Sequence, residues 1–346
     1  MSDPHQRVTL QTIADHAGVT RALVSMALRN SSKVAQLTRI KIQGLAKELG
    51  YTPNPMVRAL MTSVRQGRGP TYRATLAFLT QYKTRDIWKT WHSYPEYIRG
   101  ATERGQELGY NIEHFWMGDY AKDPARFTAV LKARGIAGII VPPLPIEKRS
   151  LEIDVSGFSI VALGYTLDSP TVPRVCNHHV QTMEQAIQRA LEHGHERIGI
   201  VIRDTDIERV NHLWMAGVTT AQRRFPRAEI VIFAPAAWSQ AAYEKWYRRT
   251  RPEVIIGVTL DVWKWTQALG RRIPDQLGFL HLDCQRNDHL SGMYQNTHRL
   301  GGAAVEILAS LVEGNIRCEE EESRITMIGS DFNPGTTIRQ ITRSRK

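Results

Sequence analysis

From residue 74 onward the chain alternates short apolar, β-branched runs with longer segments of helical periodicity. Repeated β-α units of this kind predict parallel sheets covered by helices on both faces. The pattern restarts near residue 195, which favours two lobes of similar design over a single sheet. We expect strands at 75–80, 111–115, 137–141, 159–163, 197–202, 228–233, 254–258 and 278–282, and helices at 95–108, 123–134, 180–193, 208–224, 239–249, 261–269 and 298–313.

The N-terminal segment has a different pattern, made of short helices only. Thr9 precedes apolar positions at helical spacing, Gly18 supplies a sharp turn, and the hydroxyl of Thr20 is placed to cap a second helix that continues to Arg29. Two short helices joined by a glycine-containing turn form a helix-turn-helix. A third helix is expected over residues 36–49.

A short connector follows this all-α head. Asn54 can cap, and Pro55 can open, a fourth helix over residues 56–61. A helix of about two turns is not stable alone in water, so it must fold against a partner. Residues 65–70 are rich in glycine and arginine and serve as the linker to the body.

Positive charge is concentrated in the head. Residues 1–70 contain ten lysines and arginines against three acidic residues, a net charge of +7 out of +11 for the whole chain. The other 276 residues therefore carry only +4. This distribution favours a head that approaches a polyanion, although a merely solvated basic face is the alternative.

Several classes of protein are disfavoured by the composition. The three cysteines are too few and too scattered for a disulfide framework or a Cys-x-x-Cys zinc site. The first residues lack a secretory signal, and no run approaches the roughly 20 apolar residues of a membrane span. We therefore expect a cytoplasmic protein with no metal, no cofactor and no membrane partner.

Six segments of the head form a recognisable set, namely Val8–Leu10, Ile13-Ala14, Ala17–Val19, Val24-Ser25, Thr38-Arg39 and Leu49–Pro55. Together they resemble the head of the lactose-repressor (LacI/GalR) family of transcription regulators. The body is similar to that family's ligand domain, which resembles periplasmic sugar-binding proteins, through Glu107–Gly109, Gly194–Gly199, Ile273–Asp275 and Leu300–Val305. The implied fold is an all-α helix-turn-helix head with a two-lobed, Rossmann-like α/β body.

The resemblance also implies a division into domains. We expect the DNA-binding head at residues 1–52 and the hinge helix and linker at 53–72. The N-terminal lobe would comprise 73–193 and 297–325, and the C-terminal lobe 194–296 and 326–346.

For the head, the resemblance implies that the second helix lies in the major groove of DNA, where Arg21 is placed to pair with a guanine. Met26 departs from the family, since an arginine often contacts a base there. Leu60 matches a hinge leucine that wedges between base pairs in the minor groove once two copies have packed together. The DNA-binding positions are Thr9, Thr20, Arg21, Ala22, Ser25, Met26, Arg29, Lys33, Arg39, Asn54, Arg58 and Leu60.

A hinge helix that folds only against the hinge helix of a second copy of the chain implies a homodimer. Such a dimer binds a pseudo-palindromic operator in double-stranded DNA. The C-terminal tail shows no heptads, and whether dimers pair further stays open.

For the body, the resemblance implies a small sugar-like effector bound between the lobes, at the carboxyl ends of the strands. Carboxylates accept hydrogen bonds from neighbouring sugar hydroxyls, and tryptophan faces stack on pyranose rings. Trp214 stands where many members keep an arginine, and Leu260 where an asparagine often precedes the aspartate. The ligand-binding positions are Trp91, Ser93, Tyr94, Trp214, Asp261, Asp283 and Gln295.

Three other functions were weighed. An enzyme is the first, because four histidines, His92, His178, His179 and His281, lie near expected strand ends, but no phosphate-binding loop, nucleophile elbow or His-x-x-x-His pair accompanies them. A solute-binding receptor would need an export signal, and a nonspecific DNA-binding protein would have a basic body. We predict a regulator without catalytic residues. Repression is the family default, and the effector and the sign of its effect stay open.

Overall fold

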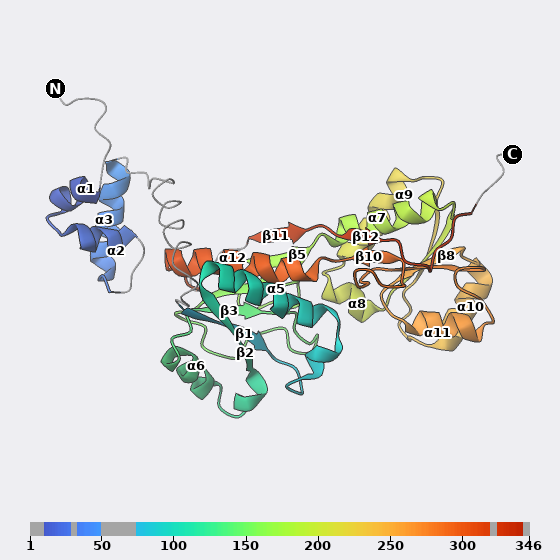
Figure 1. Ribbon diagram of the computed structural model, residues 1–346, viewed down its shortest axis with the longest axis horizontal. Helices are drawn as coiled ribbons and strands as arrows, with labels where there is room; N and C mark the ends of the chain where they lie inside the picture. Colours follow the sequence, from blue (N-terminus) through green and yellow to red (C-terminus); the bar gives the residue numbers. More distant parts are fainter. Residues whose placement is uncertain (1–9, 29–32, 50–73, 319–323, 342–346) are drawn as a thin grey trace, which may run out of the picture.

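The computed structural model describes residues 10–28, 33–49, 74–318 and 324–341, with the side chain of Ser25 left out. It contains a head of three helices and a body of two α/β lobes (Figure 1). Within these residues, no helix has the length and apolar character that crossing a membrane requires. The predicted fold class, an all-α head with a two-lobed α/β body, is confirmed.

The head is formed by α1 (Leu10–Ala17), α2 (Arg21–Leu28) and α3 (Gln36–Glu48). Gly18 makes the turn between α1 and α2 with φ of +66°, a conformation that favours glycine. Ile13, Val24 and Ile42, one from each helix, are buried in a common core. The third helix confirms the one expected over residues 36–49, and its Ile40 is 57% exposed.

The first lobe is built on a six-stranded parallel sheet with the strand order β11-β5-β4-β3-β1-β2. Helices α5 and α12 cover one face of this sheet and α6 the other. The short 3-10 helices η1 and η2 precede α5 and α6. The bounds are β1 Ala74–Thr80, η1 Ile87–Thr90, α5 Ser93–Leu108, β2 Tyr110–Trp116, η2 Met117–Tyr120, α6 Pro124–Ala133, β3 Gly138–Val141, β4 Ser159–Leu163, β5 Arg174–Asn177, α12 Thr297–Gly314 and β11 Ile325–Ile328.

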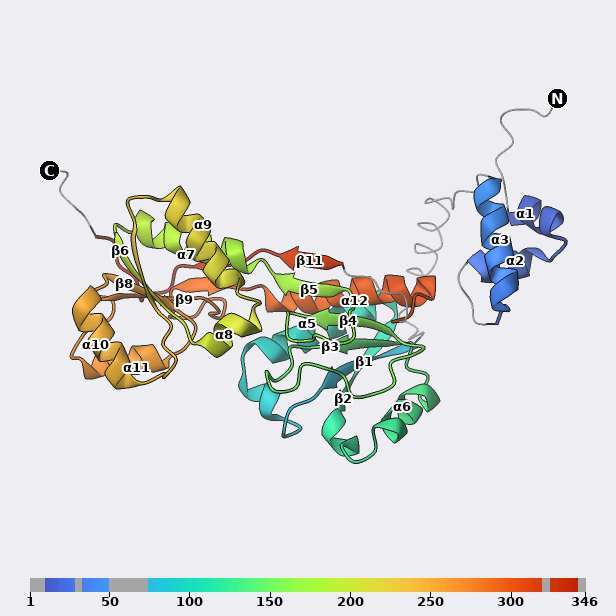
Figure 2. The same ribbon diagram turned by 180° about the vertical axis from the view of Figure 1, so that it is seen from behind.

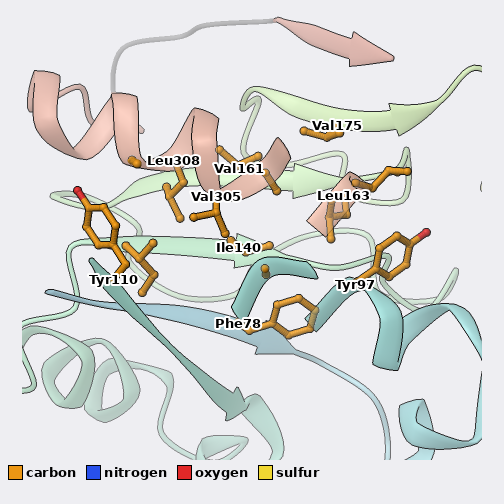
Figure 3. Close-up of a cluster of buried hydrophobic side chains, with 14 of the residues drawn as sticks. Phe78, Tyr97, Tyr110, Ile140, Val161, Leu163, Val175, Val305 and Leu308 are labelled. Carbon is orange, nitrogen blue, oxygen red and sulfur yellow. The ribbon is translucent and has the colours of Figure 1, made fainter. Parts of the chain in front are cut away.

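Figure 3 shows the core between this sheet and its two covering helices. Phe78, Ile140 and Val161 come from three neighbouring strands, and Val305 and Leu308 from α12; all five are fully or almost fully buried. The continuous apolar runs of these strands follow from helices covering both faces of the sheet.

The second lobe repeats the design with the strand order β12-β10-β9-β8-β6-β7. Helices α7 and α9 lie over one face, and α10 and α11 over the other (Figure 2). All pairs are parallel except β10 with β12, which is antiparallel. The bounds are α7 His179–Glu192, β6 Arg197–Val201, α8 Asp204–Arg209, α9 Leu213–Arg224, β7 Glu229–Phe233, α10 Gln240–Thr250, β8 Val254–Gly257, α11 Asp261–Ala268, β9 Gly278–His281, β10 Gly292–Tyr294 and β12 Asp331–Asn333.

The chain passes between the lobes at different residues from those expected. Met183 and Ala186 of α7 lie in the core of the second lobe, so we place the first crossing before α7 and not at residue 193. Strand β11 pairs with β5 of the first lobe, so we place the last crossing between β11 and β12 and not at residue 325. The four short strands β5, β10, β11 and β12, which flank the crossings, were not predicted.

One expected helix is divided in two. The segment predicted as one helix over 208–224 contains the end of α8 and the whole of α9, because Asn211 and His212 have φ of +52° and +59° and interrupt the helix. Non-glycine residues adopt this left-handed conformation at an energetic cost, and asparagine and histidine adopt it more readily than most. The break turns α8 into a separate short helix at the carboxyl end of β6.

Two glycines allow α5 and α12 to lie in close contact. A Cβ atom on Gly100 would lie 1.9 Å from the carbonyl oxygen of His298, and one on Gly301 would lie 2.0 Å from the carbonyl oxygen of Tyr97. A side chain at either position would push the helices apart. This contact fixes α5, whose first turn contains Tyr94.

Candidate functional site

The exposed start of α2 is the candidate contact surface of the head. The backbone N–H of Leu23 donates to Oγ1 of Thr20 at 3.2 Å, as expected for a capping residue. Arg21 and Ala22 follow and are exposed. Nε2 of Gln43 on α3 donates to the carbonyl oxygen of Ala27 at 3.0 Å, which ties α2 to α3. The helix therefore presents its first turn on a fixed support.

The other predicted DNA-binding positions are distributed as follows. Met26 is half-buried and packs against the head core, so only part of its side chain is accessible to DNA. Lys33 is exposed, and Arg39 on α3 is half-buried. The remaining predicted positions, Thr9, Arg29, Asn54, Arg58 and Leu60, lie outside the described residues, as does the side chain of Ser25.

A cleft of about 910 Å³ lies between the two lobes. Its walls are formed by residues that follow the carboxyl ends of β1 and β3 in the first lobe and of β6, β8 and β9 in the second. This is the edge at which parallel α/β sheets bind ligands. Four of the seven predicted ligand positions line it, namely Trp91, Ser93, Tyr94 and Asp283.

The first lobe contributes an aromatic wall. Trp91 is 38% exposed, and its ring centroid lies 4.8 Å from that of Tyr82 and 5.2 Å from that of Tyr94. The hydroxyls of Tyr82 and Tyr94 contact each other and both donate to the carbonyl oxygen of Pro143. The tyrosines hold the tryptophan ring at the cleft, where it can stack on the apolar face of a ring-shaped ligand.

The second lobe contributes Asp283, which reaches the first lobe at His92. Nε2 of His92 lies 3.3 Å from Oδ1 of Asp283, close enough for an ion pair but without the alignment of a hydrogen bond. Burial lowers the pKa of His92, but Asp283 outweighs this effect, so the pKa lies above its usual value. The backbone N–H of Asp283 donates to Nδ1 of His281 at 3.1 Å, which fixes the loop after β9.

Two arginines follow β6 and also line the cleft. Nε and Nη2 of Arg203 donate to the carboxylate of Asp206 at 2.7 and 3.1 Å, a bidentate pair within the second lobe. Nη1 of Arg209, at the end of α8, donates to the carbonyl oxygen of Leu144 in the first lobe at 3.4 Å. The second lobe thus supplies most of the charged side chains of the cleft.

Three predicted ligand positions do not line the cleft. Trp214 is 4% exposed and belongs to the core of the second lobe, where its ring packs against His179. Asp261 accepts from Nε1 of Trp238 at 3.3 Å. Gln295 is buried, and its Nε2 donates to the carbonyl oxygen of Leu282 at 2.7 Å. The nearby Leu260 does line the cleft and is 48% exposed.

Several cleft residues were not among the predicted ligand positions, chiefly Tyr82, His92, Arg203 and Arg209. One signal was present for the arginines. Arg203 directly follows the expected strand 197–202, at the edge where ligand contacts gather. Arg209 fell inside the predicted helix 208–224, which hid the separate short helix α8 that ends at this residue. Tyr82 likewise follows the first expected strand directly.

The histidines near strand ends do not assemble a metal site. Among the described residues, no group of three or more histidine, cysteine or acidic side chains is arranged to hold a metal ion. Burial lowers the pKa of His179 to about 4 and also lowers the pKa of His281.

Family models match three consecutive parts of the chain. The model of bacterial regulatory proteins of the lacI family matches residues 9–54. The model of periplasmic binding proteins and the sugar-binding domain of the LacI family matches residues 75–228, and that of periplasmic binding protein-like domains matches residues 187–328. The chain belongs to the LacI family. The resemblance to this family that the sequence showed is thus confirmed.

A curated relative of this LacI-family chain is the HTH-type transcriptional regulator MalR of Streptococcus pneumoniae. The two are 25% identical over 195 residues, which is 56% of this chain and 56% of MalR. The match therefore spans little more than half the length of that relative.

Two solved structures share the fold over nearly the whole chain. A complex of the transcriptional regulator CelR with cellobiose has a TM-score of 0.57 at 19% identity, covering 96% of this chain and 100% of that one. A Lac repressor dimer bound to operator and the anti-inducer ONPF has a TM-score of 0.55 at 17% identity, with the same coverage. At these identities the likeness concerns the fold alone.

Proposed function

We propose that this LacI-family chain binds a pseudo-palindromic DNA operator as a homodimer in the cytoplasm, represses transcription there, and responds to a small sugar-like effector bound in the cleft. One observation carries the proposal. A single chain combines a basic helix-turn-helix head with a two-lobed body that encloses a cleft of about 910 Å³.

The head supports DNA binding through α2. Arg21 is the first residue of this helix, is exposed, and follows the capping residue Thr20. An arginine at the start of a recognition helix can form two hydrogen bonds to a guanine edge, which discriminates between bases by about 1–3 kcal/mol. Lys33 and Arg39 would add phosphate contacts, which position the head without specifying sequence. The Lac repressor dimer, whose overall fold is shared over 96% of this chain, is bound to operator.

The remaining DNA contacts are proposed from the family resemblance. The hinge helix would contain Asn54, Arg58 and Leu60 and would pack against the hinge helix of the second subunit over the minor groove. Leu60 would insert there between base pairs. This arrangement is the reason for proposing a dimer and a two-fold symmetric operator.

The cleft supports a ring-shaped ligand with several hydroxyls. Trp91 offers an aromatic face from the first lobe, and Asp283 offers a carboxylate from the second. A ligand that contacts both walls stabilises the lobe arrangement in which the walls face each other. Suppose that the free energy of operator binding differs by about 1–3 kcal/mol between this lobe arrangement and the alternative one. Because the two binding events are thermodynamically linked, the ligand then changes the free energy of operator binding by up to the same amount.

The test is selection of binding sequences from random DNA by the full chain, repeated with a panel of sugars. We expect a two-fold symmetric consensus and a change in its affinity with at least one sugar. Arg21→Ala should weaken binding to the consensus, whereas Arg248→Ala, an exposed arginine on α10, should not. Equal affinity for the consensus and scrambled DNA under every condition would exclude the proposed function.

A further inference from the structure

Arg209 lies at the boundary of the two lobes. It ends α8 of the second lobe, lines the cleft and donates to the carbonyl oxygen of Leu144 in the first lobe. The hydroxyl oxygens of Tyr82 and Tyr94 lie beside its guanidinium. Its charge is therefore held among uncharged groups of the aromatic wall.

This arginine lacks a carboxylate partner, unlike its neighbours. Arg203 is paired with Asp206, and Arg149 with Asp168, at 2.7 Å in both cases. Four acidic residues line the cleft. Asp206 pairs with Arg203, Asp283 with His92 and Asp288 with His289, and Glu147 forms no ion pair with Arg209. No ion pair within the described part of the chain includes Arg209.

The tyrosines do not neutralise this charge. Burial raises the pKa of Tyr82 and that of Tyr94, so both hydroxyls keep their protons at neutral pH. Both hydroxyls also donate to the carbonyl oxygen of Pro143. A half-buried cation without a counter-ion is energetically costly, and a site that binds an anion removes that cost.

We infer that the effector carries an anionic group, a carboxylate or a phosphate, and that Arg209 binds this group at the tyrosine end of the cleft. A guanidinium has five donors in a planar fork, a geometry that matches both kinds of anion. Trp91 lies against the same two tyrosines, so the anionic group would be attached to a ring stacked on Trp91. Acidic sugars and sugar phosphates combine these features. The inference rests on the proposed ligand-sensing function.

The experiment is calorimetric titration of the full chain with charged and neutral sugars of the same ring. The probes are glucuronate, galacturonate and glucose 6-phosphate, each compared with glucose or galactose. We expect at least one acidic probe to bind about 10 to 100 times more tightly than its neutral parent, the range of a charge-assisted pair. A uronate preference identifies a carboxylate ligand, and a preference for glucose 6-phosphate identifies a phosphate ligand.

Arg209→Gln should remove the preference for the acidic probe while changing the affinity for the neutral parent by less than about threefold. Arg248→Gln, an exposed arginine of α10, is the matched control and should retain the preference. Arg209→Lys keeps the charge but loses the fork, so it should retain only part of the preference. Thermal unfolding without ligand checks that each variant folds.

Two outcomes overturn the inference. The first is that no acidic probe binds more tightly than its parent. The second is that Arg209→Gln weakens acidic and neutral probes equally, which identifies Arg209 as a contact that holds the lobes together. Neither result affects operator selection, so failure of the inference remains distinct from failure of the proposed function.

Discussion

The two walls of the cleft differ in chemistry although the two lobes share one design. The first lobe presents aromatic rings, with Tyr82, Trp91 and Tyr94 packed on one another, whereas the second presents charged groups such as Arg209 and Asp283. Rings bind through shape and stacking, and charges bind through directed hydrogen bonds. On the proposed function, a ligand would gain its full set of contacts only when the two lobes face each other.

The largest expected effect concerns the helix pair that supports the aromatic wall. Gly301→Ala would place a Cβ 2.0 Å from the carbonyl oxygen of Tyr97, so α5 and α12 must separate. We expect a loss of about 2–3 kcal/mol in the free energy of unfolding, at the upper end of overpacking costs. Urea unfolding measures it.

Gly302→Ala is the matched control for that substitution. A Cβ at Gly302 would meet Cβ of Arg104 at 3.6 Å, an ordinary contact. Since alanine favours a helix over glycine by up to about 1 kcal/mol, this variant should be as stable as the wild type or more so. If both variants were equally destabilised, the close helix contact would not be the support of the aromatic wall.

The next effect tests the charged wall. Asp283→Asn keeps the shape of the side chain but removes its charge, and we expect ligand affinity to fall by about 10 to 100 times, as for loss of a charge-assisted hydrogen bond. Asp275→Asn, at an exposed ion pair with Arg272, should leave affinity unchanged. Titration with the effector found in the sugar panel provides the measurement, and an unaltered affinity in Asp283→Asn would remove this residue from the site.

A smaller change in ligand affinity tests whether the aromatic and the charged wall bind the ligand in different ways. Trp91→Ala should lower ligand affinity about tenfold, because stacking on an aromatic face is lost. Leu260→Ala removes a side chain of similar exposure from the opposite wall, 48% against 38%, and should change affinity by less than about threefold. If the two variants lost the same amount of ligand affinity, both walls would contribute through buried apolar area alone.

The sequence predicted the lobes well and the cleft only in part, for identifiable reasons. Strands such as β1 and β6 are long apolar runs and were found, whereas β10 and β12 have three residues each and carry too little pattern. Trp214 was placed in the cleft by resemblance, but a large ring on α9 gains more by packing in the core. Arg209 was missed because two left-handed residues divide a segment whose periodicity indicates one helix.

The smallest expected effect is the pH dependence of the contact that joins the walls. The pKa of His92 lies above its usual value because Asp283 outweighs the opposing effect of burial. A histidine of this kind stabilises the fold below the pKa of the unfolded chain, about 6.5, and this contribution is lost as pH rises through the folded value. Asp288 also faces His92 and acts in the same direction.

Wild type should therefore exceed His92→Gln in the free energy of unfolding most at pH 6 and least at pH 8, by under about 1 kcal/mol in total. The difference between the two proteins is the quantity to compare. Burial lowers the pKa of His179, which destabilises the fold as pH falls, but this histidine is common to both proteins and its effect cancels. The pKa of His281 is lowered by burial and, to a lesser extent, by the charge of His92, so a part of its effect stays in the difference and opposes that of His92 as pH falls. A difference that is constant from pH 6 to 8 would show that His92 joins the walls by packing and not by charge.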